Sequence, residues 1–161
     1  MRAALEAGCA ALLLLAMAGC ASPRRDEDLT ATYREAGVTV TLRLRGASLT
    51  ATYRPDRAGF HLYSAAMPPD GVDGLGRPTV LAAGHGLTAT GPAVADRAPT
   101  TLHEAALGVD LPVYPDGPVT LTLPVTTSGA PVEAVIGYAA CSLTQCLMPI
   151  TEQAVTLHTA H

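Results

Sequence analysis

Residues 138–149, which read YAACSLTQCLMP, contain two cysteines separated by four residues. They follow a run from Val132 to Tyr138 in which every second residue is apolar, and they end at a proline. A disulfide needs its two Cα atoms within a narrow range of distances, and a tight turn over four residues can supply it. Such a bridge can form and break without moving the rest of the chain. We therefore interpret Cys141 and Cys146 as a reversible thiol–disulfide pair.

The composition is that of a β-rich domain with a small aliphatic core. The 161 residues include 10 Lys and Arg against 14 Asp and Glu, which gives a formal charge of -4. Nucleic-acid-binding proteins carry clustered basic side chains, whereas this chain has no basic run beyond Arg24 and Arg25. Thr, Val, Ala, Gly and Pro dominate, with one Phe and no Trp. Length and composition predict one β-rich domain that does not bind nucleic acid.

The N-terminal residues predict an extracytoplasmic, membrane-anchored lipoprotein on the periplasmic or cell-surface face. An apolar run over residues 7–18 is shorter than the roughly 20 residues that a membrane-spanning helix needs, but it suits a secretory signal. It ends in Met-Ala-Gly-Cys at residues 17–20, which resembles a bacterial lipobox. The expected parts are a lipoprotein signal peptide over 1–19, a lipid on Cys20, a flexible tether over 20–29 and a folded domain over 30–161. The alternatives are an ordinary leader with a chance cysteine and a buried apolar helix.

The cysteine count leaves one pair in the folded domain. Cys9 is removed with the leader and Cys20 would be acylated, so Cys141 and Cys146 remain. Disulfides persist outside the cytoplasm. A bridge that closes about six residues stabilises a fold by only about 2 kcal/mol, which favours a bridge that opens. Local structural disulfides are nevertheless common in secreted proteins, so the residues alone leave a structural bridge open as the alternative.

Alternating apolar and polar residues predict seven or eight short strands. The predicted strands cover 29–34, 38–45, 49–54, 60–64, 79–83, 119–126, 132–140 and 154–158, and the hexapeptide LTATYR occurs in the first and the third. The stretch 65–117 is rich in Gly and Pro and is predicted to be largely irregular, with a short helical turn over 100–106. Long irregular segments in compact domains tend to be functional. Many short strands separated by turns predict an antiparallel β-sandwich.

Three short motifs resemble the N-terminal domain of the thiol:disulfide interchange protein DsbD. Tyr-Ala-Ala-Cys at 138–141 and Cys-Leu-Met-Pro at 146–149 are similar to the family's Tyr-x-x-Cys, short loop, Cys and proline. Gly-Phe-His-Leu-Tyr at 59–63 is similar to its Gly-aromatic-x-Leu-Tyr strand. Val-Tyr at 113–114 and Leu-Pro-Val at 123–125 resemble a third segment. The match covers most of the predicted domain, but its specific motifs are confined to these pieces.

The resemblance implies an immunoglobulin-like β-sandwich that carries out thiol–disulfide interchange. The cysteine pair would relay electrons between a membrane-embedded or thioredoxin-like donor and other extracytoplasmic proteins, and we expect no cofactor and no metal at the pair. Cys141 would be the sulfur that is attacked and Cys146 its resolving partner. No cationic residue adjoins the pair in sequence, so only His61, through space, offers a reason for a lowered thiol pKa.

The resemblance also implies a set of residues around the pair. A flap formed by the loop before Tyr114 would cover the disulfide, with Leu107 near its tip. The remaining residues expected to flank the pair are His61, Tyr63, Tyr138 and Pro149.

The chain departs from the family pattern at several points. Leu107 stands where the flap often has an aromatic residue. Met148 stands where the family's usual Cys-x-Pro-Pro pattern has a proline, so only one of the two prolines is present. The sequence shows neither a membrane-spanning electron carrier nor a thioredoxin-like CxxC domain. We therefore expect a stand-alone module whose donor and acceptor are separate proteins.

Two other classes of protein remain open on the residues alone. In a non-catalytic, lipid-anchored binding or scaffold module the bridge would be a structural disulfide that only stabilises the fold. A copper- or zinc-binding module would draw on soft ligands, namely the two cysteines, Met67, Met148, His158 and His161, although their spacing matches no closed zinc site. No nucleophile elbow or paired-carboxylate motif supports a hydrolase.

Overall fold

The computed structural model describes residues 28–160. The predicted signal peptide, Cys20 and the predicted tether up to residue 27 lie outside the described residues, as does His161. Within residues 28–160 the chain forms strands and no helix. The strands are β1 (Leu29–Glu35), β2 (Val38–Arg45), β3 (Ser48–Pro55), β4 (His61–Tyr63), β5 (Val80–Ala83), β6 (Leu87–Ala89), β7 (Val94–Ala95), β8 (Thr100–Glu104), β9 (Val109–Tyr114), β10 (Val119–Thr127), β11 (Val132–Tyr138), β12 (Ala140–Cys141) and β13 (Ile150–Thr159).

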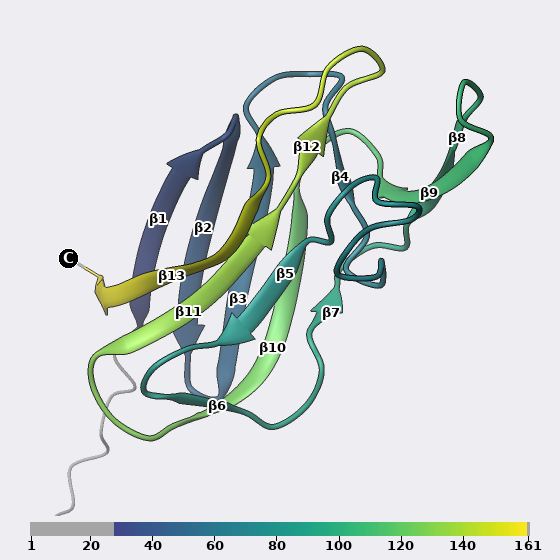
Figure 1. The fold of residues 1–161 in the computed structure, drawn as a ribbon. Helices are drawn as coiled ribbons and strands as arrows, with labels where there is room; N and C mark the ends of the chain where they lie inside the picture. Colours follow the sequence, from purple (N-terminus) through teal and green to yellow (C-terminus); the bar gives the residue numbers. More distant parts are fainter. Residues whose placement is uncertain (1–27, 161) are drawn as a thin grey trace, which may run out of the picture.

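The strands form two antiparallel sheets. The larger has the order β5-β11-β13-β1-β2-β3-β10-β6, with β7 paired to β10, and the smaller has the order β12-β4-β9-β8. The large sheet folds over, so that β5, β11 and β13 form a layer across β2, β3 and β10 (Figure 1). The predicted all-β, antiparallel sandwich is confirmed.

The core lies between these layers and follows from the alternation in the strands. Val38, Val40 and Leu42 of β2 are fully buried, and the threonines and arginines between them are half-buried or exposed. Both copies of LTATYR form strands, and both pair with β2. Tyr33 of the first copy and Tyr53 of the second lie opposite Val40 from its two sides. The two copies therefore occupy equivalent places on either side of one central strand.

The stretch 65–117 contains more strand than the sequence predicts. The short helical turn predicted over residues 100–106 is wrong, because Thr100–Glu104 is the strand β8, which forms a hairpin with β9. β-branched threonines favour extended backbone, and the hairpin pairs Leu102 with Leu111. Gly108, at a φ of 66°, lies in the turn that joins the strands.

The small sheet positions the cysteines. β11 ends at Tyr138 in the core, and the chain passes directly into β12, which pairs with β4. β4 pairs in turn with β9, so residues far apart in sequence meet around Cys141. In Figure 1 β12 and the turn after it lie at the upper end of the sandwich, and the β8–β9 hairpin projects beside them.

Candidate functional site

Cys141 and Cys146 form a disulfide with their Cα atoms 4.1 Å apart. The turn between them is held by its own hydrogen bonds. The Ser142 amide donates to the Gln145 carbonyl at 2.7 Å, and the Ser142 hydroxyl accepts from the Gln145 amide at 3.1 Å. The Leu147 amide donates to the Ala140 carbonyl at 3.0 Å, just outside the turn. These bonds hold the turn together independently of the S–S bond.

The two cysteines differ in their exposure. Cys141, in β12 of the small sheet, is 3% exposed, whereas Cys146 is exposed. The turn around Cys146 carries two exposed apolar side chains, Leu143 at 81% and Met148 at 80%. A partner thiolate approaching from solvent therefore meets the sulfur of Cys146 first. This geometry favours the reverse of the roles implied by the family resemblance.

Tyr63 and His61, both on β4, lie beside Cys141. His61 is the cross-strand partner of Cys141, and its ring packs edge-on against that of Tyr63 with 5.4 Å between centroids. The Tyr63 hydroxyl donates a hydrogen bond to Cys141 Sγ at 3.1 Å. Burial raises the pKa of Tyr63, with a smaller contribution from Glu104, so the hydroxyl remains a donor at neutral pH.

His61 is neutral at neutral pH. Burial lowers its pKa, and the opposing effect of Asp116 is smaller. Its buried Nε2 has no hydrogen-bond partner among residues 28–160. His61 therefore does not supply the positive charge that the sequence suggested for it.

A pH dependence follows from the lowered pKa of His61. The unfolded chain takes up a proton on this histidine near the ordinary pKa of about 6.5, at a higher pH than the folded chain does. The contribution of neutral His61 to the free energy of unfolding is therefore fully present above the pKa of the unfolded chain. It is lost as the pH falls toward the pKa of His61 in the folded chain. Urea unfolding between about pH 7.5 and 5.5 should show this loss, and His61→Phe should reduce it. The matched replacement at exposed His158, His158→Phe, should leave this loss of unfolding free energy unchanged. If the free energy of unfolding fell equally with pH in both variants, His61 would be excluded as the cause.

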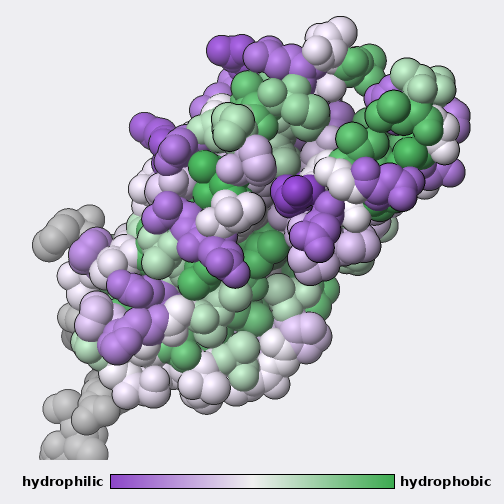
Figure 2. All heavy atoms as spheres, viewed as in Figure 1, coloured by the Kyte–Doolittle hydropathy of each residue, from purple (hydrophilic) through white to green (hydrophobic). Residues whose placement is uncertain are grey.

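The cover over Cys141 comes from the β8–β9 hairpin and from the loop over residues 67–75. Buried side chains around Cys141 include Tyr63, Met67, Leu111, Val113 and Ala139, with Val72, Leu75, Leu102 and Val109 partly buried against them. The β8–β9 hairpin contributes its paired residues to this cover, whereas Leu107 at the turn is 60% exposed and is not in the cluster. Figure 2 shows hydrophobic side chains gathered on this hairpin, beside the upper end of the sandwich.

Tyr138 and Pro149 play different parts at the two ends of the cysteine segment. Tyr138 is fully buried, packs edge-on against Tyr53 with 5.9 Å between ring centroids, and donates to the Glu35 carbonyl at 2.9 Å. Pro149 is exposed and lines the cavity at the disulfide. Tyr138 therefore anchors the segment in the core, while Pro149 borders the sulfurs.

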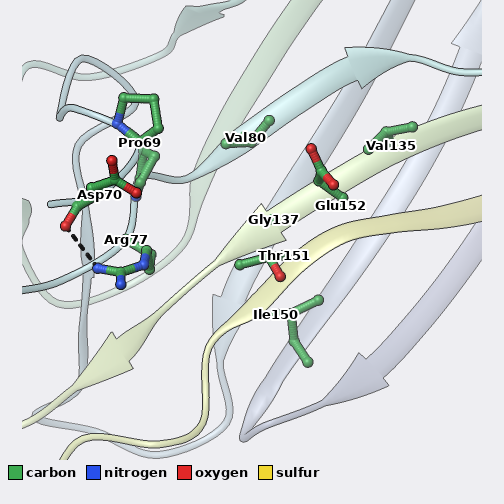
Figure 3. A pocket seen from close by; sticks show the side chains of 10 residues that line it. Pro69, Asp70, Arg77, Val80, Val135, Gly137, Ile150, Thr151 and Glu152 are labelled. Carbon is green, nitrogen blue, oxygen red and sulfur yellow. Dashed lines mark hydrogen bonds between the residues drawn. The ribbon is translucent and has the colours of Figure 1, made fainter.

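A shallow cavity of about 200 Å³ opens onto the disulfide. Its lining residues are Gly74, Gly76, Arg77, Ala139, Cys141, Cys146, Leu147 and Pro149. Arg77 also lines a neighbouring cavity of about 300 Å³, whose walls include Val80, Val135 and Ile150 (Figure 3). Arg77 is a site residue that the sequence did not indicate, because it lies 64 positions before Cys141 in a loop without a recognisable motif.

No group of three or more His, Cys, Asp and Glu side chains within residues 28–160 is placed to hold a metal ion. Over the same residues, no helix has the length and apolar character needed to cross a membrane.

Comparisons with known proteins return a likeness among solved structures but none among family models or curated proteins. No protein-family model matches the sequence, and no curated protein matches it. Among solved structures, the chain is similar to the crystal structure of the Neisseria meningitidis DsbD N-terminal domain in the reduced form. The identity is 14%, the match covers 76% of this chain and 91% of that chain, and the TM-score is 0.49.

Proposed function

We propose that this chain is an extracytoplasmic thiol–disulfide interchange module that relays electrons through the Cys141–Cys146 bridge. The observation that carries the proposal is the asymmetry of the bridge. One sulfur is buried and accepts a hydrogen bond from Tyr63, and the other belongs to an exposed residue in a turn with its own hydrogen bonds. Exposed disulfides are the ones that exchange readily.

The exchange proceeds in two balanced steps. A partner thiolate attacks the sulfur of Cys146 and forms a mixed disulfide, while the Cys141–Cys146 bond breaks and its electron pair leaves on Cys141 as a thiolate. A second partner thiolate then attacks the partner's sulfur in the mixed disulfide and releases Cys146 as a thiolate. The partner becomes a disulfide, and this chain gains two electrons and, once both thiolates are protonated, two protons. The reverse steps pass the electrons to an acceptor disulfide.

The proposed partners are proteins. The donor is a thioredoxin-like or integral-membrane electron-transfer protein, and the acceptors are extracytoplasmic proteins with disulfides. Support for this location is the leader, with its lipobox-like residues ending at Cys20. We propose that signal peptide 1–19 is removed, that Cys20 carries a lipid, and that the tether over 20–29 holds the domain near a membrane.

The reduction potential of the bridge tests the proposed function. Equilibration of the oxidised domain with glutathione buffers should give a potential above about −300 mV, because structural bridges lie below that value. The oxidised domain should also accept electrons from a reduced thioredoxin-like protein. A potential below that limit, together with no exchange, would instead identify a binding or scaffold module with a structural bridge.

A further inference from the structure

Opening the bridge creates a thiolate at a buried position. Cys141 is 3% exposed, and removal from water disfavours the charged form of a thiol. A thiol with a raised pKa is a slower leaving group in disulfide exchange. Tyr63 donates one hydrogen bond to Cys141 Sγ. A buried thiolate also needs a positive charge nearby if Cys141 is to leave readily.

Arg77 is the candidate for that charge. Of the residues that line the cavity at the disulfide, Arg77 alone carries a cationic side chain. His61 lies opposite Cys141 but is neutral, as shown above. Within residues 28–160 no carboxylate lies within ion-pair distance of Arg77. A guanidinium remains protonated at every physiological pH, so its charge is always present.

The loop before Arg77 holds its guanidinium in place. Nη1 donates to the backbone carbonyls of Asp70 at 2.9 Å, Gly74 at 3.2 Å and Gly76 at 2.5 Å, and Figure 3 shows the contact with Asp70. Gly76 itself lies against Tyr63, since a Cβ there would be 2.7 Å from the Tyr63 ring. The same loop therefore fixes both the guanidinium and the ring that donates to Cys141. No described hydrogen bond in residues 28–160 uses Nε or Nη2 of Arg77, so both retain donor capacity.

We propose that Arg77 is a positioning residue that stabilises the Cys141 thiolate electrostatically and so makes Cys141 the leaving sulfur in exchange. This inference rests on the proposed function, and it adds the group that compensates the buried charge. The basis for the interaction is that Arg77 and both cysteines line one cavity of about 200 Å³, and a cationic side chain beside a thiol favours its thiolate.

The ionisation of Cys141 tests this proposal without needing a partner. In a Cys146→Ser background, Cys141 is the titrating cysteine of the domain, and its thiolate is followed by ultraviolet absorbance against pH. Adding Arg77→Gln should raise the pKa of Cys141 by about 1 or more. In the otherwise native chain, Arg77→Gln should lower the equilibrium constant for reduction by glutathione severalfold. An unchanged pKa of Cys141 in a folded Arg77→Gln variant would overturn the proposal, even if the bridge exchanges normally.

Two variants separate charge from loop structure. Arg77→Lys keeps the charge but loses the planar fork, and the pKa of Cys141 should stay close to the native value. An equal rise in Arg77→Lys and Arg77→Gln would assign the effect to the loop hydrogen bonds and overturn the proposal. Arg97→Gln removes the same charge from an arginine that pairs with Asp96 and does not line this cavity. The pKa of Cys141 should not change in Arg97→Gln, and a rise equal to that in Arg77→Gln would mean a general charge effect.

Discussion

A Cys141→Ser variant should accumulate stable mixed disulfides with its redox partners, and a Cys146→Ser variant should accumulate none. The reason is the difference in exposure between the two sulfurs. Cys146 is exposed and can react with a partner, whereas Cys141, in β12 of the small sheet, is 3% exposed. In transfer to an acceptor disulfide, Cys141 is the thiol that attacks Cys146 and releases the reduced acceptor, so without Cys141 the bond between Cys146 and the acceptor persists. Non-reducing electrophoresis of the full chain expressed in its native host, after acid quenching, would measure the captured species.

The two cysteine variants are matched controls for each other. Each loses the same bridge over about six residues, so each should lose about 2 kcal/mol of unfolding free energy. A difference in captured partner therefore reflects the reactivity of the remaining thiol and not the stability of the fold. Capture by Cys146→Ser alone would restore the roles implied by the family resemblance. Capture by neither variant would contradict the interchange function.

Tyr138→Ala should destabilise the domain by about 3–5 kcal/mol, as large aromatic truncations in cores do. Tyr138 is fully buried, packs against Tyr53 and is three residues before Cys141. The loss would be a large part of the 5–15 kcal/mol that typical domains have. Urea unfolding of the oxidised protein would measure it.

Two milder replacements show where the effect arises. Tyr138→Phe keeps the ring and removes only the hydrogen bond to the Glu35 carbonyl, so it should cost about 1 kcal/mol. Leu143→Ala, in the exposed turn, should change stability by less than about 0.5 kcal/mol. A cost for Tyr138→Ala no larger than that for Leu143→Ala would contradict the role of Tyr138 as the anchor of the cysteine segment.

The prediction of the strands succeeded where alternation was long, as in β2 and β10, and failed at β8. In β2 and in β10 buried residues alternate with half-buried or exposed ones over eight positions, and the structure has both strands where the sequence predicts them. β8 has only five residues, all half-buried or exposed. Its extended form depends on pairing with β9 and on Leu102 packing toward the cluster around Cys141. A local pattern does not contain that information.

The site, like the fold, could be predicted from the sequence only in part. Proximity in sequence brings Cys141 and Cys146 together, and the alternation in β4 puts His61 and Tyr63 on one face. The sequence could not say that His61 would be neutral, since its pKa depends on burial by other segments. It gave no sign of Arg77, whose place in the disulfide cavity depends on the fold of the glycine-containing loop before it.

By itself, the sequence determined the antiparallel β architecture and the close cysteine pair, because strand alternation and a four-residue turn are local properties of the chain. Only the tertiary structure decided which sulfur is buried, which hydroxyl reaches it and which cation shares its cavity. Those features arise where β4, β9, β12 and the loop before Arg77 pack together. Burial and electrostatic environment depend on neighbours in space, and residues distant in sequence supply them.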